Sequence, residues 1–245
     1  MRLKTLVTIA AVVGAAIFYS VLLGQNRSGA VTPRDESVRA ENVATVFREI
    51  MGALDQTIPS ALVKKAYGIG VITRIVKGGS AIGCPYGKGL VAQRIADGSW
   101  ATPLFIEITG GSFGRHLDAE DVDLIIIFTN RSSIVPILKG KLTIGPNAPA
   151  AAGPIARTAE PGASNPLSSA IYSYSRSKGL LAGIALSGIV VRLDDEANKS
   201  VYGKNSSGPD TGAPSGADLT IVQPFLDALH KYAHGEAPRL NTRER

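Results

Sequence analysis

Three short stretches of the chain place basic and aromatic side chains next to glycines. They are 77–79 (KGG), 86–89 (YGKG) and 172–179 (YSYSRSKG). Glycine permits tight turns in which backbone N–H groups and a Lys or Arg side chain surround an anion such as phosphate. The same pattern is typical of a hairpin turn whose Gly supplies a positive φ angle and whose Lys is merely solvated. These residues alone leave both interpretations open.

One serine is the sharpest catalytic candidate. Ser112 lies within 110–114 (GGSFG), which fits the G-x-S-x-G pattern of a nucleophile elbow. Asp210 and His230 or His234 follow in the chain order that such a triad requires. However, the elbow needs a long helix after the serine, and only a short polar segment precedes the apolar run that starts at residue 122. We therefore favour a glycine-lined bend between two strands and expect no enzyme activity.

Motifs for nucleotides and metals are incomplete. The segment around Lys88 lacks the leading Gly and the Ser or Thr of a phosphate-binding loop. The chain has one Cys and three His, which is too few for a usual structural zinc site. His230 and His234 lie four residues apart, but no third ligand accompanies them. We predict no bound metal and no cofactor.

Charge is distributed unevenly along the chain. Residues 125–192 contain seven basic residues and a single acid, whereas residues 194–236 contain seven acids and three lysines. The basic residues stand singly, without the clusters or interleaved aromatic residues that nucleic acids require. This pattern excludes a nucleic-acid partner and remains compatible with a surface for anionic lipid head groups.

The N-terminus has the features of an export segment. Residues 5–24 carry no charge and follow Arg2 and Lys4. Their length suits a membrane-spanning helix, while the small residues at 28–30 suit a cleaved signal peptide. Both alternatives predict that the rest of the chain is exported, to the periplasm or cell envelope. In the first alternative, residues 5–24 hold the protein to the inner membrane.

The periodicity of apolar residues predicts helices first, then strands, then a final helix. We expect helices at 37–54, 59–65, 131–138 and 219–234, a short helix that begins at 194, and strands at 67–76, 88–95, 103–109, 122–129, 170–176 and 180–192. This order indicates an α+β fold with a mainly antiparallel sheet. We expect the sheet to be strongly curved, sandwich- or barrel-like, and flanked by a few short helices.

Shifts in composition along the chain predict the domain organisation. Residues 1–30 form the signal peptide or signal anchor, and a short linker follows to residue 36. The main domain covers 37–203, and a Gly- and Ser-rich loop follows it. The remaining segments are a C-terminal helix that packs on the domain and a tail, at 219–235 and 236–245.

Several of these segments resemble the SYLF domain, a lipid-binding family. The resemblance is carried mainly by 58–66 (IPSALVKKA), 86–90 (YGKGL), 170–180 (AIYSYSRSKGL) and 194–203 (DDEANKSVYG). It covers roughly residues 40–203. It implies a domain that binds membrane lipids, phosphoinositides in eukaryotic members, some of which also associate with actin. It implies no enzyme activity, and the export segment resembles the bacterial, single-domain branch.

The sequence hypothesis is therefore a non-enzymatic protein of the cell envelope that binds anionic phospholipid through Gly-flanked basic turns. Charge-assisted contacts to phosphate would come from the cations Lys77, Lys88, Arg176 and Lys178. Three rings would lie at the membrane interface, namely Tyr86, Tyr172 and Tyr174. The alternatives are a scaffold for an envelope protein partner, in which these motifs only shape the sheet, and a hydrolase built on Ser112.

Overall fold

The computed structural model describes residues 32–54, 56–77, 85–111, 122–156, 168–203 and 219–234. Contacts divide the chain into two compact units, 1–31 and 32–245, and every element described below belongs to the second unit. The expected export segment lies outside the described residues. Among the residues that are described, no helix is long and apolar enough to cross a membrane.

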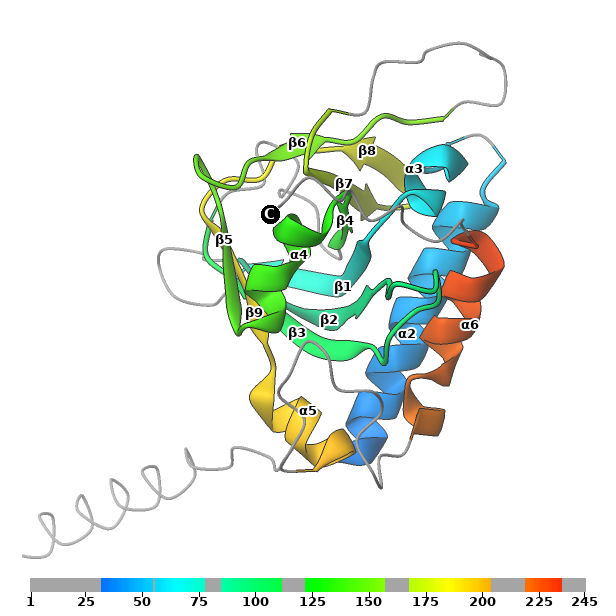
Figure 1. The fold of residues 1–245 in the computed structure, drawn as a ribbon, viewed down its shortest axis with the longest axis vertical. Helices are drawn as coiled ribbons and strands as arrows, with labels where there is room; N and C mark the ends of the chain where they lie inside the picture. Colours follow the sequence, from blue (N-terminus) through cyan, green and yellow to red (C-terminus); the bar gives the residue numbers. More distant parts are fainter. Residues whose placement is uncertain are drawn as a thin grey trace, which may run out of the picture. The chain divides into compact units, whose positions relative to one another are not determined.

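The centre of the second unit is a nine-stranded sheet (Figure 1). Its strand order is β5-β9-β3-β2-β1-β4-β7-β6, and β8 pairs with β7 beside β6. All pairings are antiparallel except that of β6 with β7. The strands are β1 (Gly68–Lys77), β2 (Pro85–Gln93), β3 (Leu104–Thr109), β4 (Val122–Phe128), β5 (Lys141–Ile144), β6 (Ala150–Ala152), β7 (Ile171–Ser177), β8 (Leu180–Gly183) and β9 (Ile189–Leu193).

The sheet curves until its two outer strands come close. β5 and β6 stand at opposite ends of the strand order, yet only residues 145–149 join them. A bridge between Ala150 and Leu186 ties β6 to the segment that leads into β9. The result is a nearly closed, strongly curved sheet with a few helices, which confirms the predicted α+β class.

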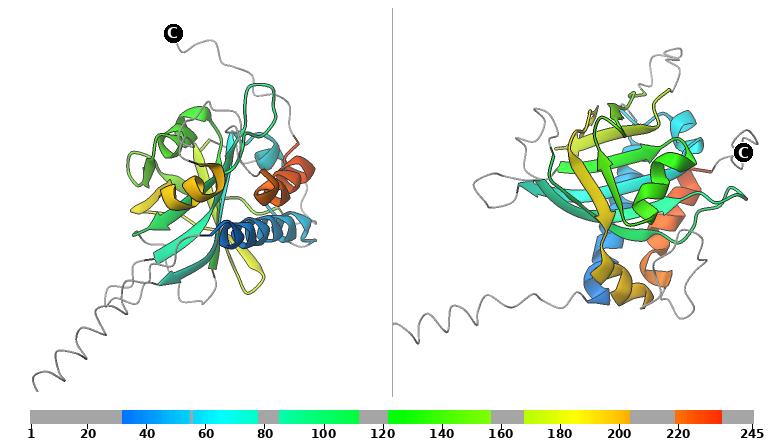
Figure 2. Two further views of the ribbon diagram at one scale, coloured as in Figure 1. Left: turned by 90° about the horizontal axis from the view of Figure 1, so that it is seen from below. Right: turned by 60° about the vertical axis from the view of Figure 1, so that its left-hand side comes forward.

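Helices lie on both faces of the sheet (Figures 1 and 2). α2 and α6 pack side by side on one face, and α4 fills the concave face. The helices are α2 (Pro33–Gly52), α3 (Ser60–Lys64), α4 (Arg131–Leu138), α5 (Asp195–Tyr202) and α6 (Gln223–Tyr232), with a 3-10 turn η2 (Leu219–Ile221) before α6.

Local sequence explains where these helices begin. Thr32 and Asp35 form a reciprocal capping box at the start of α2. The Asn130 side chain accepts a hydrogen bond from the Ser133 N–H at 2.9 Å and so caps α4. Asp194 caps α5 in the same way, by accepting from the Ala197 N–H.

Two apolar layers explain why the central strands read as continuous hydrophobic runs. On the concave face, Ile134 and Ile137 of α4 join the core formed by strand residues such as Leu124. On the opposite face, Phe47 of α2 packs edge-on against Phe225 of α6. Strands between two such layers are buried on both sides, as the apolar run of β4 from Leu124 to Phe128 predicts.

The structure corrects the sequence prediction at several strands. The expected strand at 180–192 is divided into β8 and β9, which pair with different neighbours. β5 and β6 were not predicted. β2 begins at Pro85, so Lys88 lies inside a strand rather than in a Gly-flanked turn.

Close packing of β1 against β2 explains the glycines around Lys88. A Cβ atom on residue 89 would lie only 1.9 Å from the Val71 carbonyl oxygen, so no residue larger than glycine fits at this position. The pairing of these strands shifts register between Thr73 and Val76, the mark of a β-bulge. The YGKG motif therefore serves strand packing rather than a phosphate-binding turn.

Candidate functional site

Lys88 belongs to a half-buried cluster of charges, which we call the Asp194 cluster. It consists of Glu36, Arg39, Lys88 and Asp194. Asp194 Oδ2 accepts from Lys88 Nζ at 2.7 Å and from Arg39 at 2.9 Å, and Arg39 also pairs with Glu36 at 2.9 Å. The cluster joins α2, β2 and the start of α5, so its first role is to hold these elements together.

The pKa values in the cluster are shifted by competing effects. Burial acts to raise the pKa of Asp194, but hydrogen bonds from Lys88, the Ala197 N–H and Arg39 outweigh it and lower that pKa. For Lys88, burial acts to lower the pKa, and Asp194 outweighs it and raises the pKa. Lys88 is therefore a charged group already paired inside the protein, and a lipid phosphate would have to compete with Asp194 for it.

Arg176 is also paired within the fold. Its guanidinium contacts Glu49 of α2 at 2.5 Å and lies 3.8 Å from Asp123 of β4. Asp123 and Arg176 are directly opposite each other in the β4–β7 pairing. Arg176 of β7 thus contacts α2 directly, whereas Lys88 of β2 reaches α2 only through Asp194, which also pairs with Arg39 of that helix.

The three predicted tyrosines occupy different environments. Tyr174 is fully buried and donates to the Pro154 carbonyl oxygen at 3.1 Å, and the buried Tyr172 hydroxyl accepts from the Ser169 N–H at 3.0 Å. This burial conflicts with the expected placement of both rings at a membrane interface. Tyr86 is 37% exposed, and its hydroxyl donates to Glu107 at 3.2 Å.

The segment DDEANKSVYG also has structural tasks. Asn198 bonds both backbone groups of Phe105: it accepts from the N–H at 2.9 Å and donates to the carbonyl at 2.8 Å. The buried Tyr202 donates to the Pro103 carbonyl oxygen. These bonds attach α5 to the start of β3. There they satisfy backbone groups that would otherwise pair with a neighbouring strand.

Exposed cations and apolar side chains gather instead at one end of the sheet, which we call the loop end. It is defined by Arg74, Val76, Tyr86, Lys178 and Leu180. β1 and β7 finish at this end, and β2, β4 and β8 start there. Val76 is 53% exposed and Leu180 is 68% exposed, which is unusual for side chains of this kind.

Both loop-end cations have a strained backbone. Within the described ranges, Arg74 (φ 52°) and Lys178 (φ 50°) are the non-glycine residues with positive φ. Arg74 lies in the bulge of β1, where its N–H donates to Asp123 Oδ1 at 3.1 Å. Lys178 and Gly179 (φ 79°) form the two-residue turn between β7 and β8, with the positive angles of a type I′ turn. Such strain is found preferentially at functional positions.

This strain gives a test of stability. Asn tolerates the left-handed region better than Lys and is preferred in type I′ turns. We expect Lys178→Asn to raise the free energy of unfolding by about 0.5–1 kcal/mol. Urea unfolding of residues 32–245 measures the change, and a lower stability would show that the Lys178 side chain itself supports the fold.

Sequence reasoning found only part of this site. Lys178 and Tyr86 were predicted, and Lys77 ends β1 opposite Pro85 at the same end. Arg74, Val76 and Leu180 were missed because each lies in an alternating strand segment that reads as ordinary sheet. The one feature of the sequence that could have pointed to Arg74 was its position as a lone charged residue within the apolar run 67–76.

Two residues of the hydrolase hypothesis, Ser112 and Asp210, lie outside the described part of the chain, whereas His230 and His234 are described and exposed. Gly110 and Gly111 end β3 with φ angles of 72° and 77°, which fits a glycine-lined bend. Across the described ranges, no group of three His, Cys, Asp or Glu side chains could hold a metal ion.

The described residues thus form a strongly curved sheet with exposed cations and apolar side chains at one end. The family model for Ysc84, described as a Las17-binding protein and actin regulator, matches residues 109–231. The chain belongs to this Ysc84 (SYLF) family, which confirms the resemblance found in the sequence.

Individual relatives agree with this assignment. Protein YSC84 of Saccharomyces cerevisiae is 33% identical over 182 residues, which cover 71% of this chain and 38% of the yeast protein. LAS seventeen-binding protein 3 of the same yeast is 33% identical over 178 residues, which cover 70% of this chain and 38% of that protein. Human SH3 domain-containing YSC84-like protein 1 is 29% identical over 217 residues, which cover 86% of this chain and 63% of the human protein. The chain thus spans less than two thirds of the length of each of these three relatives.

Proposed function

We propose that this domain binds anionic phospholipid surfaces through the loop end and catalyses no reaction. One observation carries the proposal: two strained, exposed cations, Arg74 and Lys178, stand beside the exposed apolar side chains Val76 and Leu180. The cations would contact lipid phosphates, and the apolar side chains would enter the boundary between head groups and acyl chains.

The energetics of this arrangement favour a reversible interaction. A Lys or Arg near an anionic bilayer surface contributes about 1 kcal/mol. Full burial of an exposed Leu or Val side chain contributes about 1.5–3 kcal/mol, and an interfacial position gives part of that. Tyr86 is partly exposed and its hydroxyl is hydrogen-bonded, so its ring also suits the boundary between head groups and acyl chains. Two cations and two apolar side chains therefore suffice for salt-sensitive docking.

The proposal differs from the sequence hypothesis in the residues that contact lipid. Lys88 pairs with Asp194 at the start of α5, and Arg176 pairs with Glu49 of α2, so both support the fold around the loop end rather than contact lipid. Lys77 stays a candidate because it ends β1 next to Val76. Tyr172 and Tyr174 form part of the interior.

We also propose an exported location. The apolar segment 5–24 behind Arg2 and Lys4 would direct residues after 30 to the outer side of the cytoplasmic membrane. Anionic lipids of the cell envelope would then be the available ligands.

The test compares charge removal at the two ends of β1. We expect the double variant Arg74→Gln with Lys178→Gln to bind vesicles that contain phosphatidylglycerol about 30-fold more weakly than unchanged residues 32–245, because two charge contacts are lost. Leu180→Asn should weaken binding by a similar factor. Vesicle sedimentation at several salt concentrations measures both effects and the salt dependence.

Matched controls lie at the far end of β1, about 30 Å away along the strand. Lys64→Gln with Lys65→Gln removes the same charge from two exposed residues just before β1. Ile95→Asn removes an exposed apolar side chain, 40% accessible, just beyond β2. If these controls weaken binding as much as the loop-end variants do, or if neutral vesicles bind equally well, the proposal is wrong.

A protein partner is the second candidate. It is favoured by the description of the family as Las17-binding actin regulators and by the name of the yeast relative LAS seventeen-binding protein 3. The loop end would then contact an acidic, partly apolar protein surface. Stoichiometric binding to one envelope protein, lost in the loop-end variants and accompanied by no vesicle binding, would support this candidate.

A further inference from the structure

β1 carries a bulge at Arg74 that interrupts its pairing on both edges. In the pairing with β4, Thr73 and Arg74 lie opposite a single residue, Asp123. In the pairing with β2, Arg74 and Ile75 lie opposite a single residue, Gly87. Two residues against one define a β-bulge, in which the extra residue has no partner in the ladder. Arg74 belongs to both mismatches, so it is the residue that the bulge adds to β1.

The bulge decides which side chains of β1 face the core. Along a regular strand the side chains alternate, so Ile72, Arg74 and Val76 would share one face. Ile75 would lie on the opposite face. In the structure, however, Ile72 and Ile75 both belong to the core of the concave face, so the extra residue has reversed the alternation. A regular strand would place Arg74 and Val76 on the side of Ile72, and the bulge exposes both of them instead.

The strand next to the bulge leaves room for it. A Cβ atom on residue 87 would lie 2.7 Å from Ile72 Cγ2 and 2.9 Å from Ile75 Cγ1. These distances are too short for contacts between carbon atoms, so both isoleucines can pack here because Gly87 has no side chain. Packing thus permits the bulge, but the conformation of Arg74 needs a further contribution.

That contribution comes from Asp123. The φ angle of Arg74 is 52°, in the left-handed region that is unfavourable for a residue with a Cβ atom. The Arg74 N–H donates to Asp123 Oδ1 at 3.1 Å. Hydrogen bonds to a carboxylate are stronger than those to a neutral carbonyl, so this bond favours the bulged conformation over a regular one.

The Asp123 carboxylate is itself held from the neighbouring strand. Arg176 lies directly opposite Asp123 in the β4–β7 pairing, and its guanidinium is 3.8 Å from Asp123 Oδ2. The same guanidinium contacts Glu49 of α2 at 2.5 Å. The two oxygens of Asp123 therefore face different groups, the Arg74 N–H and the Arg176 guanidinium. A carboxylate held on both sides can fix the Arg74 backbone in one position.

We propose that Asp123 is the positioning residue of the loop end: its carboxylate holds the bulge that turns Arg74 and Val76 outward. Asp123 acts through these two residues and does not contact lipid. This role rests on the proposed function of the loop end and deepens it, because it assigns a part in membrane binding to an acid. By charge alone, an acid near this surface would oppose the binding of anionic lipid.

The sign of the effect on vesicle binding tests this role. If Asp123 contributed negative charge alone, its removal would strengthen binding to vesicles that contain phosphatidylglycerol. We expect Asp123→Ala in residues 32–245 to weaken that binding about fivefold or more, the loss expected when one cation no longer reaches the surface. Asp123→Asn keeps an acceptor for the Arg74 N–H and should bind at least as tightly as the unchanged protein. Vesicle sedimentation measures both effects.

Two further measurements distinguish positioning from a general loss of structure. In a protein that already carries Arg74→Gln, Asp123→Ala should weaken binding much less, because most of the contact that it disturbs is then absent. Hydrogen exchange of the Arg74 amide should become about tenfold faster in Asp123→Ala, since that amide loses its acceptor. The Gly70 amide, in the regular part of β1, should keep its exchange rate.

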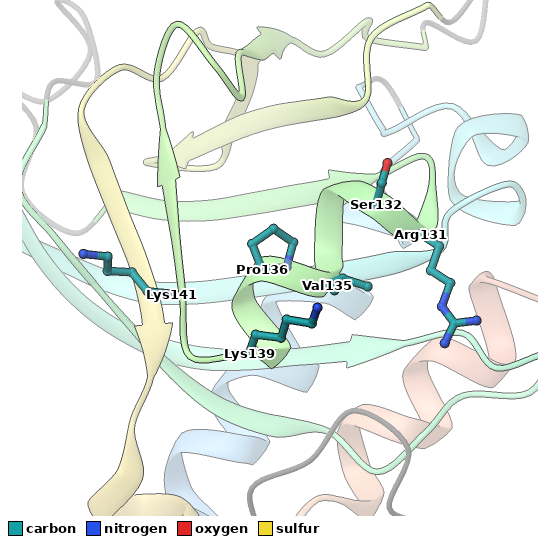
Figure 3. Close-up of a pocket in the computed structure, with 6 residues that line it drawn as sticks. All are labelled: Arg131, Ser132, Val135, Pro136, Lys139 and Lys141. Atoms are coloured by element: carbon teal, nitrogen blue, oxygen red, sulfur yellow. The ribbon is translucent and has the colours of Figure 1, made fainter. Parts of the chain in front are cut away.

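Two control variants change the charge of the domain without touching the bulge. Glu49→Ala removes an acid that also contacts Arg176, and it should not weaken vesicle binding. Lys139→Gln removes an exposed cation that lines a pocket over α4, where its ammonium extends along the helix toward Val135 (Figure 3). Lys139 lies two residues before β5, which starts at the end of the sheet opposite the loop end. Its replacement should change neither vesicle binding nor the exchange of the Arg74 amide.

Three results would overturn the role of Asp123 while the proposed function stands. They are vesicle binding by Asp123→Ala as tight as that of the unchanged protein, an unchanged exchange rate of the Arg74 amide in that variant, and weaker binding by Asp123→Asn although its acceptor remains. The third result decides the matter even if Asp123→Ala does not fold. If the unchanged protein binds no phosphatidylglycerol vesicles, the proposed function is wrong and the role of Asp123 fails with it.

Discussion

Asp194→Ala is expected to lower the free energy of unfolding by about 3 kcal/mol. The Asp194 carboxylate accepts from Lys88 at 2.7 Å, from Arg39 at 2.9 Å and from the Ala197 N–H at 3.2 Å. Its removal leaves two cations without their shared partner in a half-buried place and removes the cap of α5. Each loss is destabilising, and the unpaired charges contribute most.

The neighbouring residue provides a matched control for this prediction. Asp195 is exposed and starts α5, so Asp195→Ala removes the same charge and tests only its interaction with the helix dipole, worth about 0.3–1 kcal/mol. Asp194→Asn keeps a capping oxygen and should fall between the two. Urea unfolding of residues 32–245 gives the three values, and equal losses for Asp194→Ala and Asp195→Ala would contradict the assigned role of the cluster.

The second large effect concerns pH. Glu36 is fully buried, and one of its carboxylate oxygens has no hydrogen-bond partner. Burial raises its pKa to about 7, although Arg39 acts in the opposite direction. The folded protein therefore holds a proton on Glu36 at pH values where the unfolded chain has lost it.

The direction of the stability change follows from proton binding. A carboxyl group with a raised pKa binds more protons in the folded state, so the free energy of unfolding falls as pH rises. The contribution is fully present below the ordinary value of 4.5 and is lost as pH rises through about 7. Because one pKa unit corresponds to about 1.4 kcal/mol, the full change is about 3 kcal/mol.

Glu36→Gln tests this expectation. Glutamine is neutral at every pH and can still accept from Arg39, so the decline between about pH 5 and about pH 8 should become smaller by that amount. Unfolding by urea at both pH values gives the difference between the two proteins. If the unchanged protein and the variant show the same pH dependence, Glu36 is ionised in the folded state throughout this range.

The two effects share one structural cause. Glu36 and Asp194 both bond Arg39, and this cluster ties the first turns of α2 to the sheet. Lys88, which sequence reasoning assigned to lipid, is the fourth member of this cluster. The ends of several strands form the loop end, and a stable attachment of α2 keeps these strands aligned.

The sequence by itself determined the class of fold and the positions of most elements. Amphipathic, alternating and continuous apolar patterns locate α2, β3, β4 and β7, and the side chains of Asn130 and Asp194 locate helix starts. These features are local, because caps and periodicity act over a few residues. The same holds for the Lys178-Gly179 turn, whose composition predicts a two-residue hairpin. The start of α2 was predicted wrongly, because Pro33 to Glu36 belong to the helix rather than to a linker.

The tertiary structure decided which charged groups are paired and which are displayed. Lys88 and Lys178 look alike in sequence, each beside glycine, yet one meets Asp194 from 106 residues away and the other stands on an exposed turn. Arg74 is exposed at the loop end because a bulge interrupts the pairing of β1 with β4 at this residue. Long-range pairing fixes such outcomes, since a side chain's partner depends on strand order, register and the helix above it rather than on its neighbours in the chain.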